Sequence, residues 1–228
     1  MNTPHLTAYA RRAIAATPST SPATLALLAS DSSVIVRRAV AENQSTPPDT
    51  LAALFEDGDE RVRRCVATNS STPAALLAKL ASQAIGVFRL VTAAAQNPAM
   101  PADTLATLAR DGDEFIRSAV ARHPSTPAAT LAMLARDRSA WVRLAVGHNP
   151  ATPPDVLAVL ALSHDPVIRH HVVTNRAAPT DVLARLATDS VSLVREAVAR
   201  HPSTSPDTLA LLAGDSDGAV RRSAAARS

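Results

Sequence analysis

Leucine recurs in this chain at a fixed interval, and that interval limits the possible folds more than any other feature. The second leucine of the motif L-x-x-L-A lies 26 residues after its predecessor in every copy but one, where the interval is 28 residues. These leucines are Leu28, Leu54, Leu80, Leu108, Leu134, Leu160, Leu186 and Leu212. A period of about 20–50 residues is typical of solenoids, in which each repeat buries its apolar face only against neighbouring repeats.

A column of arginines has the same period and the same exception, between Arg89 and Arg117. Its members are Arg11, Arg37, Arg63, Arg89, Arg117, Arg143, Arg169, Arg195 and Arg221. Two independent columns therefore place a two-residue insertion in one repeat, near residues 90–97. We predict a lone helix at 5–16, eight repeats over about 17–226, and one solenoid domain spanning 1–228.

Each repeat is predicted to form two short helices, which are too short to be stable without packing. The first helix starts with a threonine, prolines and an acid, as in Thr46-Pro47-Pro48-Asp49, and the threonine hydroxyl is expected to cap it. The second helix starts near an aspartate or serine. Apolar residues one position before and two and three positions after the column arginine form one face that is expected to be buried, and the arginine itself faces away from it. Four positions after that arginine stand small residues that would let adjacent second helices approach closely, namely Ala41, Ala67, Ala93, Ala121 and Ala199.

Composition agrees with packed helices. Aromatic residues make up 2% of the chain, and its apolar residues are mostly Ala, Leu and Val. A sheet protein would be richer in aromatic and β-branched residues.

The order of residues within one repeat resembles the leucine-rich repeat variant family, and more loosely HEAT repeats. The segment 116–137, IRSAVARHPSTPAATLAMLARD, carries the shared pattern, and edited copies extend from about Tyr9 to Arg222. The resemblance implies an all-α fold, a right-handed superhelix of about eight 26-residue two-helix repeats with some 3₁₀ helix. Some family members carry a cysteine-bound iron–sulfur domain, but Cys65 is the only cysteine here, so no cofactor is implied.

The net charge of +3 is spread over 228 residues, and Lys79 is the only lysine among 23 basic residues. Such a charge is not in itself a signature of nucleic-acid binding. The sequence begins without an apolar signal segment and has no apolar run of membrane-spanning length, so we expect a soluble, cytoplasmic protein. One cysteine allows no intrachain disulfide.

Two periodic polar columns are predicted to hold the layers together. Aspartates six residues before the column arginines would pair with arginines between layers; Gln83 and Ser163 interrupt this series, so Arg89 and Arg169 are expected to be less well paired. An asparagine or histidine at the end of each second helix is expected to bond turn carbonyls and amides of adjacent layers. The two columns are Asp31, Asp57, Asp111, Asp137, Asp189 and Asp215, and Asn43, Asn69, Asn97, His123, Asn149, Asn175 and His201.

Neither a metal site nor a catalytic site is predicted. His164, His170 and His171 cluster in one repeat, but no acid or cysteine is placed to complete a metal set. Cys65 occupies a small core position and is expected to be an inert, buried thiol. No Ser-His-Asp arrangement stands out from the capping residues, so we predict that the chain is not an enzyme.

Positions that the repeat does not prescribe are the best candidates for binding. The residue after the column arginine is expected to point outward on the concave face, basic in the first layers and partly apolar in the middle. Trp141 and Phe115 lie two positions before that arginine; a competing interpretation places their column, which includes Val87, Val167 and Leu193, at the edge of the core. The predicted partner-binding residues are Arg12, Arg38, Arg61, Arg64, Leu90, Trp141, Leu144 and His170.

These residues favour a scaffold that binds a protein or an extended acidic peptide, with arginine forks on carboxylates and a central apolar anchor. The first alternative is nucleic acid, with the same arginines on phosphates, although acids lie close by and no aromatic residues are interleaved for base stacking. The second is a structural rod that assembles head to tail.

Overall fold

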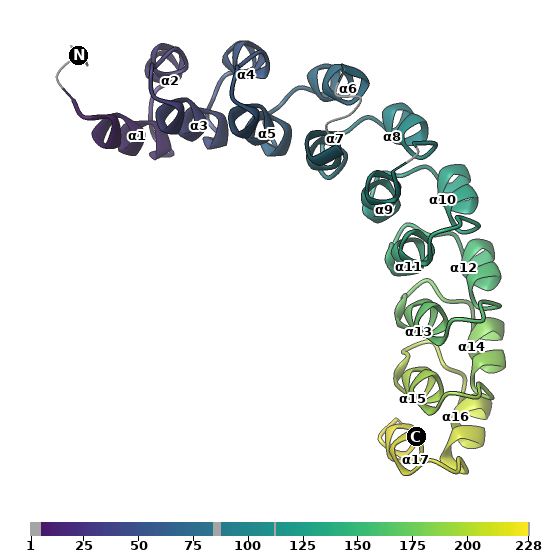
Figure 1. Ribbon diagram of the computed structural model, residues 1–228. Coiled ribbons are helices and arrows are strands. Elements are labelled where there is room, and N and C mark those ends of the chain that lie inside the picture. Colours follow the sequence, from purple (N-terminus) through teal and green to yellow (C-terminus); the bar gives the residue numbers. More distant parts are fainter. Residues whose placement is uncertain (1–5, 84–87, 112, 228) are drawn as a thin grey trace. The chain divides into compact units, whose positions relative to one another are not determined.

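A computed structural model describes residues 6–83, 88–111 and 113–227 (Figure 1). These residues contain seventeen helices and no strand, which confirms the predicted α-solenoid. All of these helices are α-helical, so the 3₁₀ helices that the family resemblance implies do not occur in the described residues. Val87 and the side chain of Gln83 lie outside the described part of the chain.

The chain divides into two compact units, residues 1–108 and 109–228, and the single solenoid domain over 1–228 stays a prediction. In a solenoid each layer contacts only its neighbours, so continuity depends on every layer keeping the regular pattern. The repeat with two extra residues, near 90–97, comes shortly before the division.

In the first unit, two layers of helices alternate along the chain (Figure 1). The second helices of the repeats form one layer and pack on one another in the order α1, α3, α5, α7. This layer consists of α1 (Ala8–Ala16), α3 (Val34–Glu42), α5 (Glu60–Thr68) and α7 (Phe88–Ala95). The first helices are α2 (Pro22–Leu28), α4 (Pro48–Phe55), α6 (Ala74–Gln83) and α8 (Ala102–Leu108).

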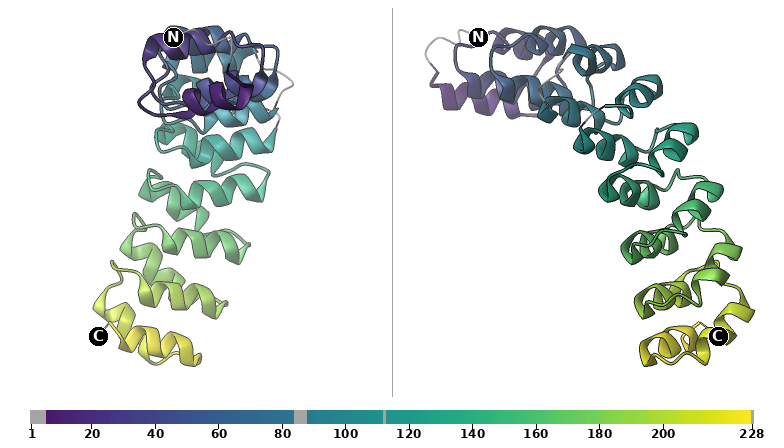
Figure 2. Two further views of the ribbon diagram at one scale, coloured as in Figure 1. Left: turned by 90° about the vertical axis from the view of Figure 1, so that its left-hand side faces the viewer. Right: turned by 45° about the vertical axis from the view of Figure 1, so that its right-hand side comes forward.

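The second unit repeats this arrangement, and both views in Figure 2 show its layers stacked one after another. Its second helices are α9 (Glu114–Arg122), α11 (Ala140–His148), α13 (Pro166–Thr174), α15 (Ser192–Arg200) and α17 (Gly218–Ala225). Its first helices are α10 (Ala128–Leu134), α12 (Pro154–Leu160), α14 (Thr180–Leu186) and α16 (Pro206–Ala213).

The core of both units lies between the two layers. Leu131 and Leu157 of the first helices and Val146 and Val172 of the second helices are fully covered there. The predicted alanines four positions after the column arginine are buried as well, which lets second helices pack against each other directly.

The threonine before each first helix does not cap that helix as predicted. Pro47 is the N-cap of α4, and the buried Thr46 hydroxyl donates a 2.6 Å hydrogen bond to Val40 O of the preceding second helix. Thr152 makes the same bond to Val146 O. A buried hydroxyl must find a partner, and the free carbonyls at the end of a helix supply one.

Arginines and aspartates of successive repeats form the predicted ladder, but the pairing runs in one direction. Arg37 donates from Nε and Nη2 to the carboxylate of Asp57, twenty residues later, at 2.7 and 3.1 Å. Its Nη1 bonds the carbonyl oxygen of Asp31, six residues earlier, at 2.8 Å. We call each arginine with the residue twenty positions later a rung; the filled rungs are Arg11–Asp31, Arg37–Asp57, Arg117–Asp137, Arg169–Asp189 and Arg195–Asp215.

This direction corrects one expectation. Arg169 is fully paired, with Nε at 2.6 Å from Asp189 Oδ2, because its partner is the aspartate of the following repeat. The serine at position 163 instead faces Arg143, whose Nη1 bonds only backbone carbonyls.

The asparagine column bonds adjacent layers as predicted. Asn149 donates from Nδ2 to Ala121 O at 2.7 Å and to His123 O at 2.9 Å, and its Oδ1 accepts from Ala151 N at 2.8 Å. Asn43, Asn69, Asn97 and Asn175 repeat this pattern.

Candidate partner-binding surface

The second helices leave one side uncovered by the first helices. The residue one position after the column arginine lies there, opposite the buried stripe, and the residue two positions before it lies at the margin of the same side, about 100° from the centre of the buried stripe. We call the surface that these positions form in each unit its second-helix face.

In the first unit this face is basic. Arg12 on α1 and Arg61 and Arg64 on α5 are exposed, and no described residue forms an ion pair with them. Arg38 on α3 is half-buried and pairs with Glu42 at 3.0 Å. The column arginines that directly precede Arg12 and Arg38 behave differently: Arg11 and Arg37 point into the ladder.

Leu90 departs from the prediction, because it is buried with 5% of its surface exposed. Helix α7 also buries Val91, Ala93, Ala94 and Ala95. Counted back from Asn97, Leu90 stands where Ile116 stands before His123, and Ile116 is likewise buried. The two extra residues of this repeat therefore place Leu90 on the buried side of the helix.

In the second unit the face carries large exposed apolar side chains. The exposed fractions are 64% for Phe115, 66% for Trp141, 49% for Val167 and 57% for Leu193. The interpretation that placed this column at the edge of the core is therefore wrong for these four residues. We call them the apolar stripe; they come from the first turns of α9, α11, α13 and α15, which follow one another in the layer.

Leu144 and His170, one turn further along α11 and α13, are half-buried beside the stripe. At the C-terminal ends of these helices stand the exposed basic side chains Arg122, His148 and Arg200, with Arg176 just after α13. We call these four residues the basic row. Phe115 and Arg122 are seven residues apart, so stripe and row share a helix face about 10 Å apart along the axis.

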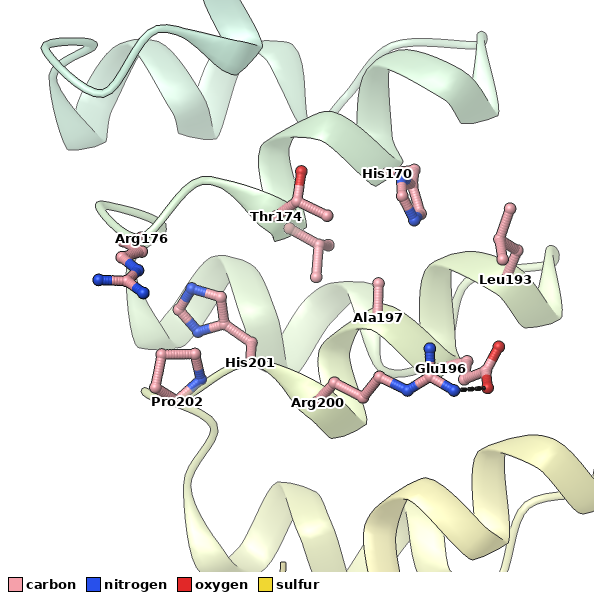
Figure 3. Close-up of a pocket in the computed structure, with 10 residues that line it drawn as sticks. His170, Thr174, Arg176, Leu193, Glu196, Ala197, Arg200, His201 and Pro202 are labelled. Atoms are coloured by element: carbon pink, nitrogen blue, oxygen red, sulfur yellow. Dashed lines mark hydrogen bonds and ion pairs between the residues drawn. The ribbon is translucent and has the colours of Figure 1, made fainter.

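A hollow of about 390 Å³ lies between α13 and α15 on this face (Figure 3). His170 and Leu193 line one end, and Arg176, His201 and Pro202 line the other. Arg200 lies along the floor and pairs with Glu196 of the same helix. A second hollow of about 400 Å³ between α15 and α17 shares Glu196 and Arg200.

The repeat pattern behind this geometry matches known repeat families. Residues 116–173 match the leucine-rich repeat variant domain model, and residues 193–217 match the leucine-rich repeat variant model. A solved structure, described as a leucine-rich repeat variant with a novel repetitive protein structural motif, is 26% identical with a TM-score of 0.65. The match covers 91% of this chain and 82% of that one. The repeats within residues 116–173 and 193–217 are leucine-rich repeat variant repeats.

Other solved structures match these leucine-rich repeat variant layers more distantly. An engineered protein is 16% identical over 95% of this chain and 82% of its own, with a TM-score of 0.42. A designed armadillo repeat protein in complex with the peptide (KR)4 is 15% identical over 96% of this chain and 88% of its own, with a TM-score of 0.27. Among curated proteins, none matches the sequence.

Burial lowers the pKa of His201, whose Nδ1 accepts from Ser203 N at 3.1 Å and whose Nε2 therefore donates to Asn175 O at 3.2 Å. Burial also lowers the pKa of His171, and the neighbouring rings of His148 and His170 add to this effect.

Cys65 is buried, as predicted, and its thiol bonds Glu42 Oε1 at 3.3 Å. Burial, with Glu42 beside it, raises the pKa of the thiol to about 12, so little reactive thiolate forms at neutral pH. Within residues 6–83, 88–111 and 113–227, no three His, Cys, Asp or Glu side chains converge as a metal site requires. No helix in the same ranges is both long and apolar enough to cross a membrane.

Proposed function

We propose that this chain is a non-catalytic scaffold whose second-helix faces bind an acidic segment of a partner protein. The observation that carries the proposal is the apolar stripe of Phe115, Trp141, Val167 and Leu193, whose side chains are exposed by about half or more. Contiguous exposed apolar side chains on a soluble protein mark interaction sites, because leaving them in water is unfavourable.

The chemistry of the partner follows from the basic row beside the stripe. A segment lying across the second helices would place apolar residues on the stripe and carboxylates against Arg122, His148 and Arg176. Arg200, which already pairs with Glu196, would contribute less. Successive helices pack about 8–10 Å apart. A segment in the polyproline II conformation advances about 9 Å in three residues, which make one turn, so every third side chain would return to the same side and meet a new layer.

In the first unit, the exposed Arg12, Arg61 and Arg64 would extend the same preference for carboxylates. Arg38, which already pairs with Glu42, would contribute less. These guanidiniums would also accept phosphates, so nucleic acid is the alternative to test. The proposal predicts little affinity for duplex DNA at physiological salt, because the stripe offers nothing to a phosphate backbone.

The chain itself supplies a matched pair of variants for the test. Leu193 on α15 and Leu211 on α16 are 57% and 55% exposed, but they lie in opposite helix layers of the second unit. Leu193→Glu should weaken binding at least tenfold, because it removes an apolar contact and places a carboxylate in the path of an acidic ligand. Leu211→Glu makes the same chemical change off the face and should leave affinity unaltered.

The probe is an acidic peptide of about twelve residues with leucine at every third position, the period of a polyproline II helix. Trp141 is the only tryptophan and is 66% exposed, so its fluorescence should shift to shorter wavelength when the peptide covers it. Equal loss in both leucine variants, or binding only to duplex DNA in a strongly salt-dependent manner, would contradict the proposal. Concentration-dependent filaments that are lost in Leu193→Glu would assign the face to self-assembly instead.

A further inference from the structure

The filled rungs of the second unit show what the column arginine is arranged to hold. In Arg117, Arg169 and Arg195, Nε lies 2.6, 2.6 and 2.7 Å from one carboxylate oxygen of the partner aspartate. Nη2 lies 2.9, 2.8 and 2.9 Å from the other oxygen. The fork of each guanidinium thus grips one carboxylate edge-on, the strongest geometry for this pair.

Arg143 is held by the same bonds but lacks the carboxylate. Its Nη1 donates to Asp137 O at 2.7 Å and Arg138 O at 3.1 Å. Arg169 has the same anchor, with Nη1 at 2.8 Å from Ser163 O and 3.1 Å from His164 O. The backbone therefore fixes the Arg143 guanidinium as it fixes the others.

The residue twenty positions after Arg143 is Ser163, which cannot fill the fork. Its side chain ends one bond short of where the carboxylate oxygens of an aspartate would lie, and its hydroxyl accepts from Asp165 N at 3.2 Å. In the described part of the chain, Nε and Nη2 of Arg143 make no hydrogen bond and no ion pair. We call Arg143 and Ser163 the open rung.

We propose that the open rung is a binding slot for a single carboxylate, from a small organic acid or from an acidic side chain or C-terminus of a partner. The ligand would take the place that Asp137, Asp189 and Asp215 occupy on the other forks. A carboxylate entering from solvent finds Nε and Nη2 already oriented, so little conformational entropy is lost on binding.

The surrounding charges favour a monoanion. In the filled rungs Arg37–Asp57 and Arg195–Asp215, a second acid stands two residues after the rung aspartate, at Asp59 and Asp217. The open rung keeps that second acid as Asp165, the N-cap of α13. One carboxylate would restore the charge of those filled rungs, whereas a dianionic phosphate would add a further negative charge beside Asp165.

This slot does not depend on the proposed function. It uses the arginine column between layers, not the stripe or the basic row. Ser163→Asp, which should fill the slot with a covalent carboxylate, leaves the second-helix face unchanged and should leave peptide binding there intact.

The test is a titration of the full chain with acetate at constant ionic strength, balanced with chloride, followed by the Nε–Hε resonances of the arginines in ¹H–¹⁵N spectra. The Arg143 resonance, assigned by its loss in Arg143→Lys, should shift and saturate with a dissociation constant on the order of tens of millimolar. The resonances of Arg117, Arg169 and Arg195 should not move. Acetate should also raise the thermal midpoint of unfolding relative to chloride.

Two serine variants separate the slot from a general salt effect. Ser163→Asp should place the Arg143 resonance among those of the paired arginines and abolish its response to acetate. Ser163→Ala should keep the response, because the fork remains open. A shift common to all arginines, an unchanged response in Ser163→Asp, or tighter binding of inorganic phosphate than of acetate would overturn the assignment.

Discussion

Replacing Asn149 by alanine tests how strongly the asparagine column ties the layers together. The side chain is 1% exposed and makes three hydrogen bonds to backbone groups, two of them to carbonyls of the preceding layer. His123 O keeps a bond from Thr126 N, but Ala121 O receives no other hydrogen bond from the described residues. Three bonds at about 1 kcal/mol each give an expected loss of about 3 kcal/mol in the free energy of unfolding.

Asn149→His is the matched variant, because histidine fills the same column position at 201. There the ring makes one bond to a carbonyl at 3.2 Å and accepts one amide at 3.1 Å, so one of the three asparagine bonds is missing. The expected loss is about 1 kcal/mol.

Urea unfolding followed by circular dichroism measures both changes. Because repeat arrays can unfold in parts, hydrogen exchange should accompany it, and protection should fall most in α9 and α11. A loss below about 1 kcal/mol for Asn149→Ala, or one no larger than for Asn149→His, would refute the view that these bonds hold the layers together.

Four further outcomes are expected. Because the folded-state pKa of His201 is lowered, the unfolded chain binds a proton more readily below about pH 6.5, so stability should fall as pH decreases from 7 to 5; His201→Asn should reduce that slope in thermal melts. Asp137→Asn should cost about 3 kcal/mol because it leaves Arg117, only 6% exposed, without its carboxylate. Glu56→Gln, which breaks the exposed pair with Lys79, should change stability by less than about 0.5 kcal/mol. Thr126→Val should cost about 1 kcal/mol by removing the buried hydroxyl's bond to Val120 O, and equal urea midpoints for variant and wild type would contradict this.

Protonation of Asp215 should lower stability at acidic pH. The hydrogen bond from Arg195 holds the pKa of Asp215 at about 2, below its usual value near 4. Its contribution to stability is therefore present at neutral pH and is lost as pH falls from about 4 to about 2.

The period of 26 residues predicted the helices, the layers, the arginine–aspartate ladder and the asparagine column, because each depends on spacing alone. Spacing did not predict the direction of pairing: Asp31 and Asp57 both recur with Arg37, and only the structure shows which carboxylate meets the guanidinium. The position of a residue on a helix predicted the exposure of Arg64 but not the burial of Leu90, because the two extra residues place Leu90 on the buried side of α7.

The apolar stripe could have been found in the sequence. Phe115 and Trp141 lie about 100° from the centre of the buried stripe, closer to the exposed side than the core interpretation assumed. The open rung could not be found in the sequence. The missing acid at position 163 is significant only once the direction of pairing, as in Arg169–Asp189, assigns that position to Arg143.

The bonds between layers join residues that are never far apart in the chain. A rung spans 20 residues, and the longest asparagine bond, from Asn97 to Ala67, spans 30. Such low contact order favours rapid folding, since no distant segment has to be found before a layer closes. Each repeat can thus dock as soon as it emerges during synthesis. The column arginine of the last docked layer then stays unpaired until the aspartate twenty residues later has been synthesised.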